Sequence, residues 1–264
     1  MATFTLSNGN KLSLIFPPLS GCLLVAEPDG RVVRSTAGFK QQFPIEIGLV
    51  PVLGHFEHDE QVVAEQTVER NLQTHRASRN FRNFWYLRSE EELDELREVV
   101  RESWDGLELE KPKLSPDVEG QPLLHMMCEE DRIPRELYWM GSGFHIWLQI
   151  MTHVLRARHS TILVIDEPET YLHPELQRYL LSFLRDAGTD CLLATHSSEL
   201  VGEAERSEVV LVDKTLRSGK RLQSSARSQA FDVLGSKFSF ALTDVLRQRV
   251  AILVEGASDL KYLY

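Results

Sequence analysis

Short hydrophobic runs, separated by turn residues, make up the N-terminal part of the chain. Asn8-Gly9 stands between the first two runs and Asp29-Gly30 between the next two, and both dipeptides favour tight hairpin turns. A further apolar run follows them. We therefore predict an antiparallel β-meander, with its strands at residues 3–6, 11–16, 22–26, 31–34 and 45–53.

From about residue 60 the pattern becomes helical. Ser89 is followed three residues later by Glu92, which is the spacing of a capping box at a helix start. Apolar residues then recur on one helical face, with Trp104 extending it: Leu93, Leu96, Val99 and Val100. Proline and charged residues crowd positions 107–120, which predicts a loop there.

Helices and strands alternate from Trp139 onward. Pro174 opens a helical stretch that Gly188 ends, and Ser197 or Ser198 is placed to cap the next helix. Short apolar strands separated by helices indicate an α/β fold, with a parallel sheet covered on both faces. The expected helices are 144–156 and 174–187, and the expected strands are 161–165, 191–194, 209–212 and 250–254.

The composition is that of a globular protein, and it says little about function. The chain has 264 residues, of which 42% are hydrophobic and 26% charged, and it carries a net charge of −10. An acidic protein repels nucleic acid, so any DNA contact must be local. Residues 207–249 carry eight Lys or Arg against four acids, and this stretch either faces phosphate or is a solvated surface.

No apolar window is long enough to span a membrane, and no signal segment opens the chain, so we expect a cytoplasmic protein without a membrane partner. The three cysteines, Cys22, Cys128 and Cys191, are far apart and predict reduced thiols. His125 with Cys128 is the one metal-like pair, and we interpret it as structural rather than as a zinc site.

The motif that carries most chemistry is a Walker B pattern, in which apolar residues 162–165 end in Asp166 and Glu167. A buried strand would place both carboxylates at its C-terminal edge, where α/β sheets bind ligands. Asp166 would hold Mg²⁺, usually through water. Glu167 would orient and polarise an attacking water.

Three further stretches surround this motif. Pro168-Glu169 and then Leu172-His173-Pro174 follow it directly. A strand ending in Thr195-His196-Ser197 comes next. Upstream, Gly141, Ser142 and Gly143 open the long helix 144–156, and such a start offers free N–H groups and a hydroxyl to an anion.

Together these stretches resemble ABC-type ATPase heads of the OLD (overcoming lysogenization defect) nuclease, SMC and RecF group. The resemblance implies a P-loop NTPase fold that binds ATP and Mg²⁺ in a head-to-head homodimer. It assigns Gly141, Ser142 and Gly143 to the signature that contacts the partner's nucleotide, although the usual Leu-Ser-Gly-Gly-Gln run is not preserved. It also assigns His173 to the D-loop and His196 to the switch that senses the γ-phosphate.

The C-terminal run 250–256 resembles the first strand and turn of a TOPRIM domain, as found after the ATPase head in OLD nucleases. Glu255 matches the metal-associated catalytic glutamate of that domain, and Asp259 stands where a nearby acid is often found. A final strand capped by a turn is the alternative. We thus expect four parts: a meander (1–56), a helical insertion (57–138), the ATPase core (139–248) and the start of a TOPRIM-like domain (249–264).

One element of an ATPase is missing from the sequence. No Gly-x-x-x-x-Gly-Lys-Ser/Thr run occurs in the 264 residues. We expect a chain truncated before the P-loop and inside the TOPRIM domain, and little ATP turnover from it alone. Three hypotheses remain: an ATPase head of a DNA endonuclease in DNA maintenance or phage defence, a nucleotide-gated scaffold whose partner supplies the P-loop, and a DNA-repair ATPase without nuclease activity.

A last stretch interleaves arginines with aromatic residues between Arg76 and Arg88. Such side chains can stack on bases and hold phosphates. Aromatics at helical spacing are also typical of a core whose arginines extend outward. The sequence leaves both interpretations open.

Overall fold

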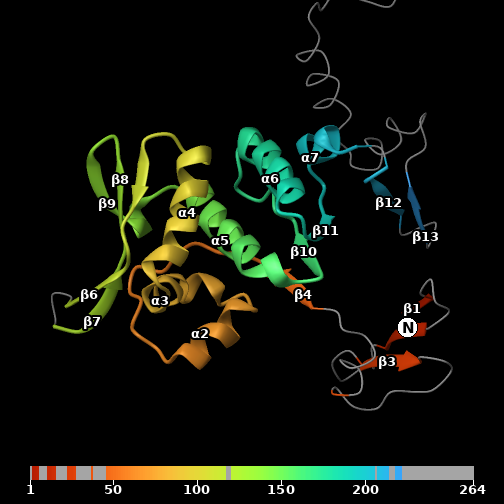
Figure 1. The fold of residues 1–264 in the computed structure, drawn as a ribbon, viewed down its shortest axis with the longest axis horizontal. Coiled ribbons are helices and arrows are strands. Elements are labelled where there is room, and N and C mark those ends of the chain that lie inside the picture. Colours follow the sequence, from red (N-terminus) through yellow and green to blue (C-terminus); the bar gives the residue numbers. More distant parts are fainter. Residues whose placement is uncertain are drawn as a thin grey trace, which may run out of the picture.

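The computed structural model describes residues 2–5, 11–15, 23–27, 37, 46–116, 120–205, 207–213 and 218–221. In the first and last of these segments it describes the backbone of strands only. The helical part, α2 to α4, and the sheet part, β10, β11 and α6, lie on either side of the long helix α5 (Figure 1). An α/β fold with a parallel sheet is confirmed.

The parallel sheet has the order β11-β10-β4 in the described residues. Its strands are β4 (Ile47–Val50), β10 (Ile162–Asp166) and β11 (Asp190–Ala194). Val164 of β10 pairs with both Leu49 and Leu192. The prediction that 45–53 extends the antiparallel meander is therefore wrong, because this strand runs parallel to a strand more than a hundred residues away.

Two helices cover one face of this sheet. The helices α5 (Ser142–Arg156) and α6 (Pro174–Asp186) share a core with the inward side chains Leu163 and Ile165. As predicted, Pro174 opens α6 and Gly188 follows it in the left-handed region (φ 70°), where glycine carries no steric penalty. Ser197 caps the short helix α7 (Ser198–Glu203).

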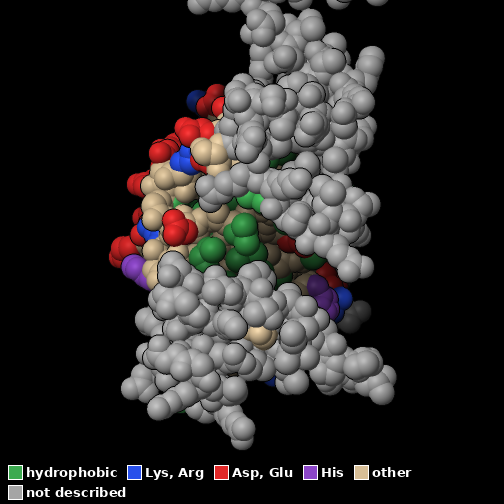
Figure 2. Space-filling view, turned by 90° about the vertical axis from the view of Figure 1, so that its right-hand side faces the viewer, with side chains coloured by type: hydrophobic (Ala, Val, Ile, Leu, Met, Phe, Trp, Pro, Cys, Tyr) green, Lys and Arg blue, Asp and Glu red, His purple; other side chains and the backbone are tan. Residues whose placement is uncertain are grey.

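The other face of the sheet is open in the described part of the chain. Side chains that alternate with the buried ones point to this face, and Leu49 and Leu192 are 48% and 58% exposed. Hydrophobic side chains appear in the middle of the corresponding side view (Figure 2). The expectation of a sheet covered on both faces is thus met, among described residues, on one face only.

The segment before α5 holds helices and short strands. The helices are α2 (Glu65–Leu72), α3 (Phe81–Leu87) and α4 (Glu90–Ser103), with a 3₁₀ turn at Ala77–Arg79. The predicted capping box is present: Ser89 Oγ accepts from Glu92 N at 3.2 Å, and Glu92 Oε2 accepts from Ser89 N at 3.0 Å. The apolar face predicted for α4 is buried.

Residues 107–109 and 113–116 form strands instead of part of the predicted loop. They open a set of antiparallel strands: β5 (Leu107–Leu109), β6 (Lys113–Pro116), β7 (Pro122–His125), β8 (Met127–Glu130) and β9 (Ile133–Glu136). β8 pairs with β5 and β9, and β6 pairs with β7. In β5 the charged Glu108 is exposed between the buried Leu107 and Leu109, so its charge belongs to the solvent face of a strand.

The remaining strands pair locally. β1 (Ala2–Thr5), β2 (Lys11–Ile15) and β3 (Leu23–Glu27) form an antiparallel sheet in chain order, which confirms the first hairpin. β12 (Val210–Asp213) pairs antiparallel with β13 (Ser218–Arg221) and not, as predicted, with the parallel sheet. The strands expected at 31–34 and 250–254 lie outside the described residues, as does most of the basic stretch 207–249.

The Arg-aromatic stretch is part of the core. Phe81, Phe84 and Trp85 are buried, and Arg82 is fully buried. Arg82 pairs with Glu60 and binds both carboxylate oxygens of Glu136. Arg79, Arg82 and Arg88 pair with glutamates, so for these residues and the buried rings the structure favours the core interpretation, whereas Arg76 is exposed.

Burial also explains why the Cys128 thiol is unreactive as a thiolate. Desolvation raises the pKa of the Cys128 thiol to about 12, so it stays protonated. Cys128 and Cys191 are free thiols. Among the described residues, no helix has the length and apolar character needed to cross a membrane.

Candidate active site at the carboxyl edge of the sheet

Asp166 and Glu167 stand where β10 ends. Leu163 and Ile165 anchor the strand in the core, and the chain then turns at Glu167, whose φ of 47° lies in the left-handed region. Glu167 N donates to Ala194 O of β11 at 2.8 Å, which fixes this turn to the neighbouring strand. The Glu167 side chain is 61% exposed, so both carboxylates are available to a ligand, as predicted.

The residues after Glu167 form a compact loop. Thr170 N donates to Glu167 O at 3.3 Å, and Leu172 N donates to Glu169 O at 2.9 Å. Tyr171 has a φ of 63°, a conformation that costs a non-glycine residue energy. His173 then caps α6, with Nδ1 accepting from Glu175 N at 3.5 Å. This capping geometry is the structural role of His173, and it leaves the ring on the surface.

His196 lies at the same edge, after β11. Its ring is 66% exposed, and Nδ1 lies 3.6 Å from Oε1 of Glu167. The two residues are neighbours because β10 and β11 are parallel, and parallel strands bring their carboxyl ends together. The switch role of His196 itself stays a prediction.

Two residues that the sequence did not single out connect these loops. The Glu169 side chain is buried, and its Oε1 accepts from His196 N at 2.8 Å and lies 3.2 Å from His196 Nδ1. Gln177 of α6 donates from Nε2 to Leu172 O at 2.9 Å and accepts from Ser197 Oγ at 2.5 Å. The two loops after β10 and β11 are therefore tied at two points.

The predicted signature residues lie against this edge. Gly141 precedes α5, and no side chain caps the first turn of the helix. A Cβ on Gly143 would come within 2.9 Å of Tyr171 O, so only glycine allows the helix start to approach the loop this closely. A Cβ on Gly141 would meet no atom within 4 Å, and Gly141 and Ser142 are at least partly exposed.

A small cavity adjoins the site. It has a volume of about 70 Å³, and its lining includes Asp166, Glu167 and Thr170 after β10, residues 50–53 at the end of β4, and Ile146 and Ile150 of α5. A much wider cavity, of about 680 Å³, lies at the opposite edge of the sheet, near Gly48 and Ser160.

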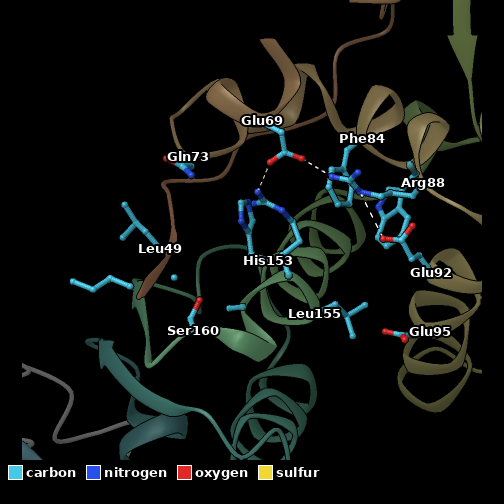
Figure 3. Close-up of a pocket in the computed structure, with 15 residues that line it drawn as sticks. Leu49, Glu69, Gln73, Phe84, Arg88, Glu92, Glu95, His153, Leu155 and Ser160 are labelled. Carbon is cyan, nitrogen blue, oxygen red and sulfur yellow. Dashed lines mark hydrogen bonds and ion pairs between the residues drawn. The ribbon is translucent and has the colours of Figure 1, made fainter. Parts of the chain in front are cut away.

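The wide cavity does not carry the predicted chemistry. Glu69 pairs with Arg156 at 2.8 Å and with Arg88, and the close-up shows the pair with Arg88 (Figure 3). Both guanidinium groups also lie over the Phe84 ring. Because its cations are already paired with carboxylates, this cavity offers an anionic ligand little free charge, and we place the candidate site at the other edge.

The carboxylates at the site fit a magnesium ion that is held partly by a nucleotide. Mg²⁺ usually binds one or two protein carboxylates and completes its shell with water and phosphate oxygens. Asp166 supplies such a carboxylate, with Glu167 beside it. Within the described ranges, no group of three or more His, Cys, Asp or Glu side chains is arranged to hold a metal ion. Glu255 and Asp259, the predicted TOPRIM acids, lie outside these ranges.

The chain is similar to proteins of known class. The chain is 31% identical to an OLD nuclease of Thermus scotoductus over 109 residues, which is 37% of this chain and 21% of that protein. The chain thus spans about a fifth of the length of this relative.

Solved structures with similarity include an Smc head domain of Pyrococcus yayanosii, with 11% identity, a TM-score of 0.42, and coverage of 61% of this chain and 30% of that one. The SMC head domain of Thermotoga maritima has 11% identity, a TM-score of 0.37, and coverage of 77% and 65%.

A family model described as "AAA domain, putative AbiEii toxin, Type IV TA system" matches residues 53–202, which is more than half of the chain and includes every described site residue. With the OLD nuclease relative, this match confirms the resemblance to ABC-type ATPase heads that the motifs indicated. The chain belongs to this AAA domain family.

Proposed function

We propose that this chain supplies the hydrolytic side of an ATPase site, in an ABC-type head of an OLD-like DNA endonuclease. The observation that carries the proposal is the meeting of Asp166, Glu167 and His196 at one sheet edge, with Glu167 Oε1 3.6 Å from His196 Nδ1. The family match supports an ATPase-type domain, and the rest of the proposal goes beyond it.

Each residue has a distinct part in the proposed chemistry. Asp166 holds Mg²⁺, which when bound offsets the negative charge of the nucleotide phosphates. Glu167 accepts a hydrogen bond from the attacking water and orients it toward the γ-phosphate. The exposed ring of His196 contacts that phosphate and responds to its loss. Exposure of all three side chains leaves room for the nucleotide.

The opposite side of the nucleotide would be held by other residues. We propose that the start of α5, with Gly141, Ser142 and Gly143, contacts a nucleotide bound by a second copy of the chain, and that His173 lies near this contact. The uncapped N–H groups of α5 suit a phosphate. The phosphate-binding loop must come from residues outside this sequence, so we expect little turnover from these 264 residues alone.

The DNA-related role is the least direct part of the proposal. Glu255 and Asp259 would belong to a metal-dependent nuclease domain, and the work of the whole protein would be in DNA maintenance or phage defence, in the cytoplasm. The absence of a P-loop motif favours one alternative, a non-hydrolysing, nucleotide-gated scaffold or DNA-repair subunit whose partner supplies that loop.

Glu167→Gln tests the proposal in a preparation that includes the phosphate-binding loop, in a longer reading frame or on a second chain. We expect ATP hydrolysis to fall about 100-fold or more, because the amide is a poor acceptor for the water proton. ATP binding should be retained, and the dimer should persist. Hydrolysis is measured as phosphate release and binding with a fluorescent ATP analogue.

Glu175→Gln is the matched control, because it makes the same substitution at an exposed position of α6 near the site. It should leave hydrolysis unchanged. Normal hydrolysis by the Glu167→Gln variant would overturn the assignment of Glu167. Absence of hydrolysis in the unsubstituted preparation, with ATP still bound, would favour the scaffold alternative.

A further inference from the structure

Glu169 stands out because it is a buried acid beside an exposed site. Its side chain is 7% exposed, whereas the side chains of Glu167 and His196 are more than half exposed. Burial of a carboxylate is costly unless hydrogen bonds compensate for the lost water. The contacts of Glu169 therefore indicate why a carboxylate is buried at this position.

Both strong contacts of the Glu169 carboxylate are with His196. Oε1 accepts the backbone N–H of His196 at 2.8 Å, and it lies 3.2 Å from the ring nitrogen Nδ1. One oxygen thus reaches the main chain and the ring of the same residue. The backbone of Glu169 is fixed in turn, because its carbonyl accepts from Leu172 N at 2.9 Å.

The second oxygen of Glu169 has no hydrogen-bond partner within the described part of the chain. An unsatisfied buried acceptor is rare in folded proteins and lowers their stability. A leucine would fill a similar volume without this loss, but it could not hold His196. The glutamate at position 169 therefore matters more for its contacts with His196 than for the packing of the loop.

We propose that Glu169 is a positioning residue for His196, an inference that rests on the proposed switch role of that histidine. Glu169 fixes the His196 backbone through its N–H and holds the ring through Nδ1. Nδ1 then carries the ring proton, and Nε2 is the nitrogen presented to the nucleotide. Because a buried group holds the ring, the exposed carboxylate of Glu167 is left for the attacking water.

The same contact links two loops that a nucleotide would join. Glu169 belongs to the loop after β10, two residues from Glu167, and His196 belongs to the loop after β11. A shift in the first loop is therefore passed to the ring of His196. The Gln177 tether joins the same loops through Ser197, but it has no described contact with His196.

The test uses the chain itself and needs no nucleotide. In Glu169→Ala, amide hydrogen exchange of His196 measured by NMR should accelerate about tenfold, because the N–H loses its acceptor. The ¹⁵N shifts of the His196 ring, recorded at about pH 8.5, should change from the Nδ1–H form toward the Nε2–H form. Glu169→Gln keeps a carbonyl acceptor and should restore most of the amide protection.

Gln177→Ala is the control for loosening of the loops in general, and it should change His196 exchange and ring shifts far less than Glu169→Ala. Unchanged exchange and ring shifts in a folded Glu169→Ala variant would overturn the proposal, and so would equal effects of the two alanine substitutions. Where hydrolysis can be measured, Glu169→Ala should lower kcat more than it raises KM. If Glu167→Gln leaves hydrolysis unaffected while Glu169→Ala changes the ring, the proposed function fails and the positioning role stands.

Discussion

A buried glutamate in the helical part and another at the edge of the sheet differ in how fully their carboxylates are hydrogen-bonded. Glu60, beside α3, accepts from the backbone and side-chain nitrogens of both Arg82 and Asn83. Glu169, beside the sheet edge, accepts one backbone N–H and leaves an oxygen without a partner. Their burial is similar, so the difference lies in how completely each carboxylate is satisfied.

The helical part has the marks of a scaffold. Burial raises the pKa of Glu60, and its hydrogen bonds and Arg82 oppose that rise, while Arg82 lowers the pKa of Glu136. The sheet edge instead combines exposed carboxylates, two residues at positive φ and an unpaired buried oxygen. Strained and unsatisfied groups of this kind persist where they serve a site. We therefore predict that substitutions in the helical part mainly lower the stability of the fold. Substitutions at the sheet edge should mainly affect function.

The largest expected effect is in the Arg82 cluster. Arg82→Met removes a cation that is fully buried between Glu60 and Glu136, and it leaves two carboxylates without their partner. Loss of one member of a buried ion pair costs about 3–5 kcal/mol. We expect a fall of this size in the free energy of unfolding, measured by urea denaturation.

Arg101→Met is the matched control for this substitution. Arg101 also binds a glutamate, Glu108, through two nitrogens, but on the surface. An exposed pair contributes about 1 kcal/mol or less. Equal costs for the two variants would contradict the view that the buried cluster is a stabilising scaffold.

Elements with complete local signals could be predicted from the sequence. The capping box at Ser89 and the Pro174-to-Gly188 stretch gave helices close to those observed, because the start and stop signals lie within the elements. β5 to β9 were missed because each is only three or four residues long and is stabilised by pairing with another segment. The parallel pairing of β4 with β10 was missed for the same reason, since no local pattern specifies a distant partner.

The candidate site also contains residues that the sequence identified and one that only the structure shows. The Asp166-Glu167 pair and His196 were each predicted at the end of a strand, and these strands lie side by side in the parallel sheet, which brings the residues together. Glu169 was not assigned a role, although it stands in the same Asp-Glu-Pro-Glu run. Its signal is its burial against the His196 backbone, 27 residues later, and only the folded chain shows that contact.

A smaller effect is expected from His153, in the scaffold part. His153 of α5 is buried, and desolvation together with Arg156 lowers its pKa to about 3. The unfolded chain takes up a proton near pH 6.5, where the folded chain does not, so stability falls as pH falls below about 6.5. This histidine alone should remove about 1.4 kcal/mol between about pH 7.5 and pH 5.5.

His153→Leu should remove that part of the pH dependence, as measured by urea denaturation at the two pH values. Some dependence of the same sign should remain, because burial also lowers the pKa of His145. Met151→Leu, a buried neutral position on the same helix, should shift stability equally at both pH values. A His153→Leu variant with the wild-type pH dependence would show that His153 is not held neutral by the fold.

The smallest expected effect tests the strained edge of the sheet. Tyr171 has a φ of 63° and is 61% exposed, and within the described part of the chain its ring contacts that of His55, at 5.2 Å between centroids. Asparagine tolerates this conformation better than tyrosine, so Tyr171→Asn should raise the free energy of unfolding by about 0.5–1 kcal/mol. The loss of an exposed ring contact offsets only part of that gain. If the variant is less stable than the wild type, the packing of the tyrosine outweighs its backbone strain. The loop at this edge would then stabilise the fold, as the Arg82 cluster does.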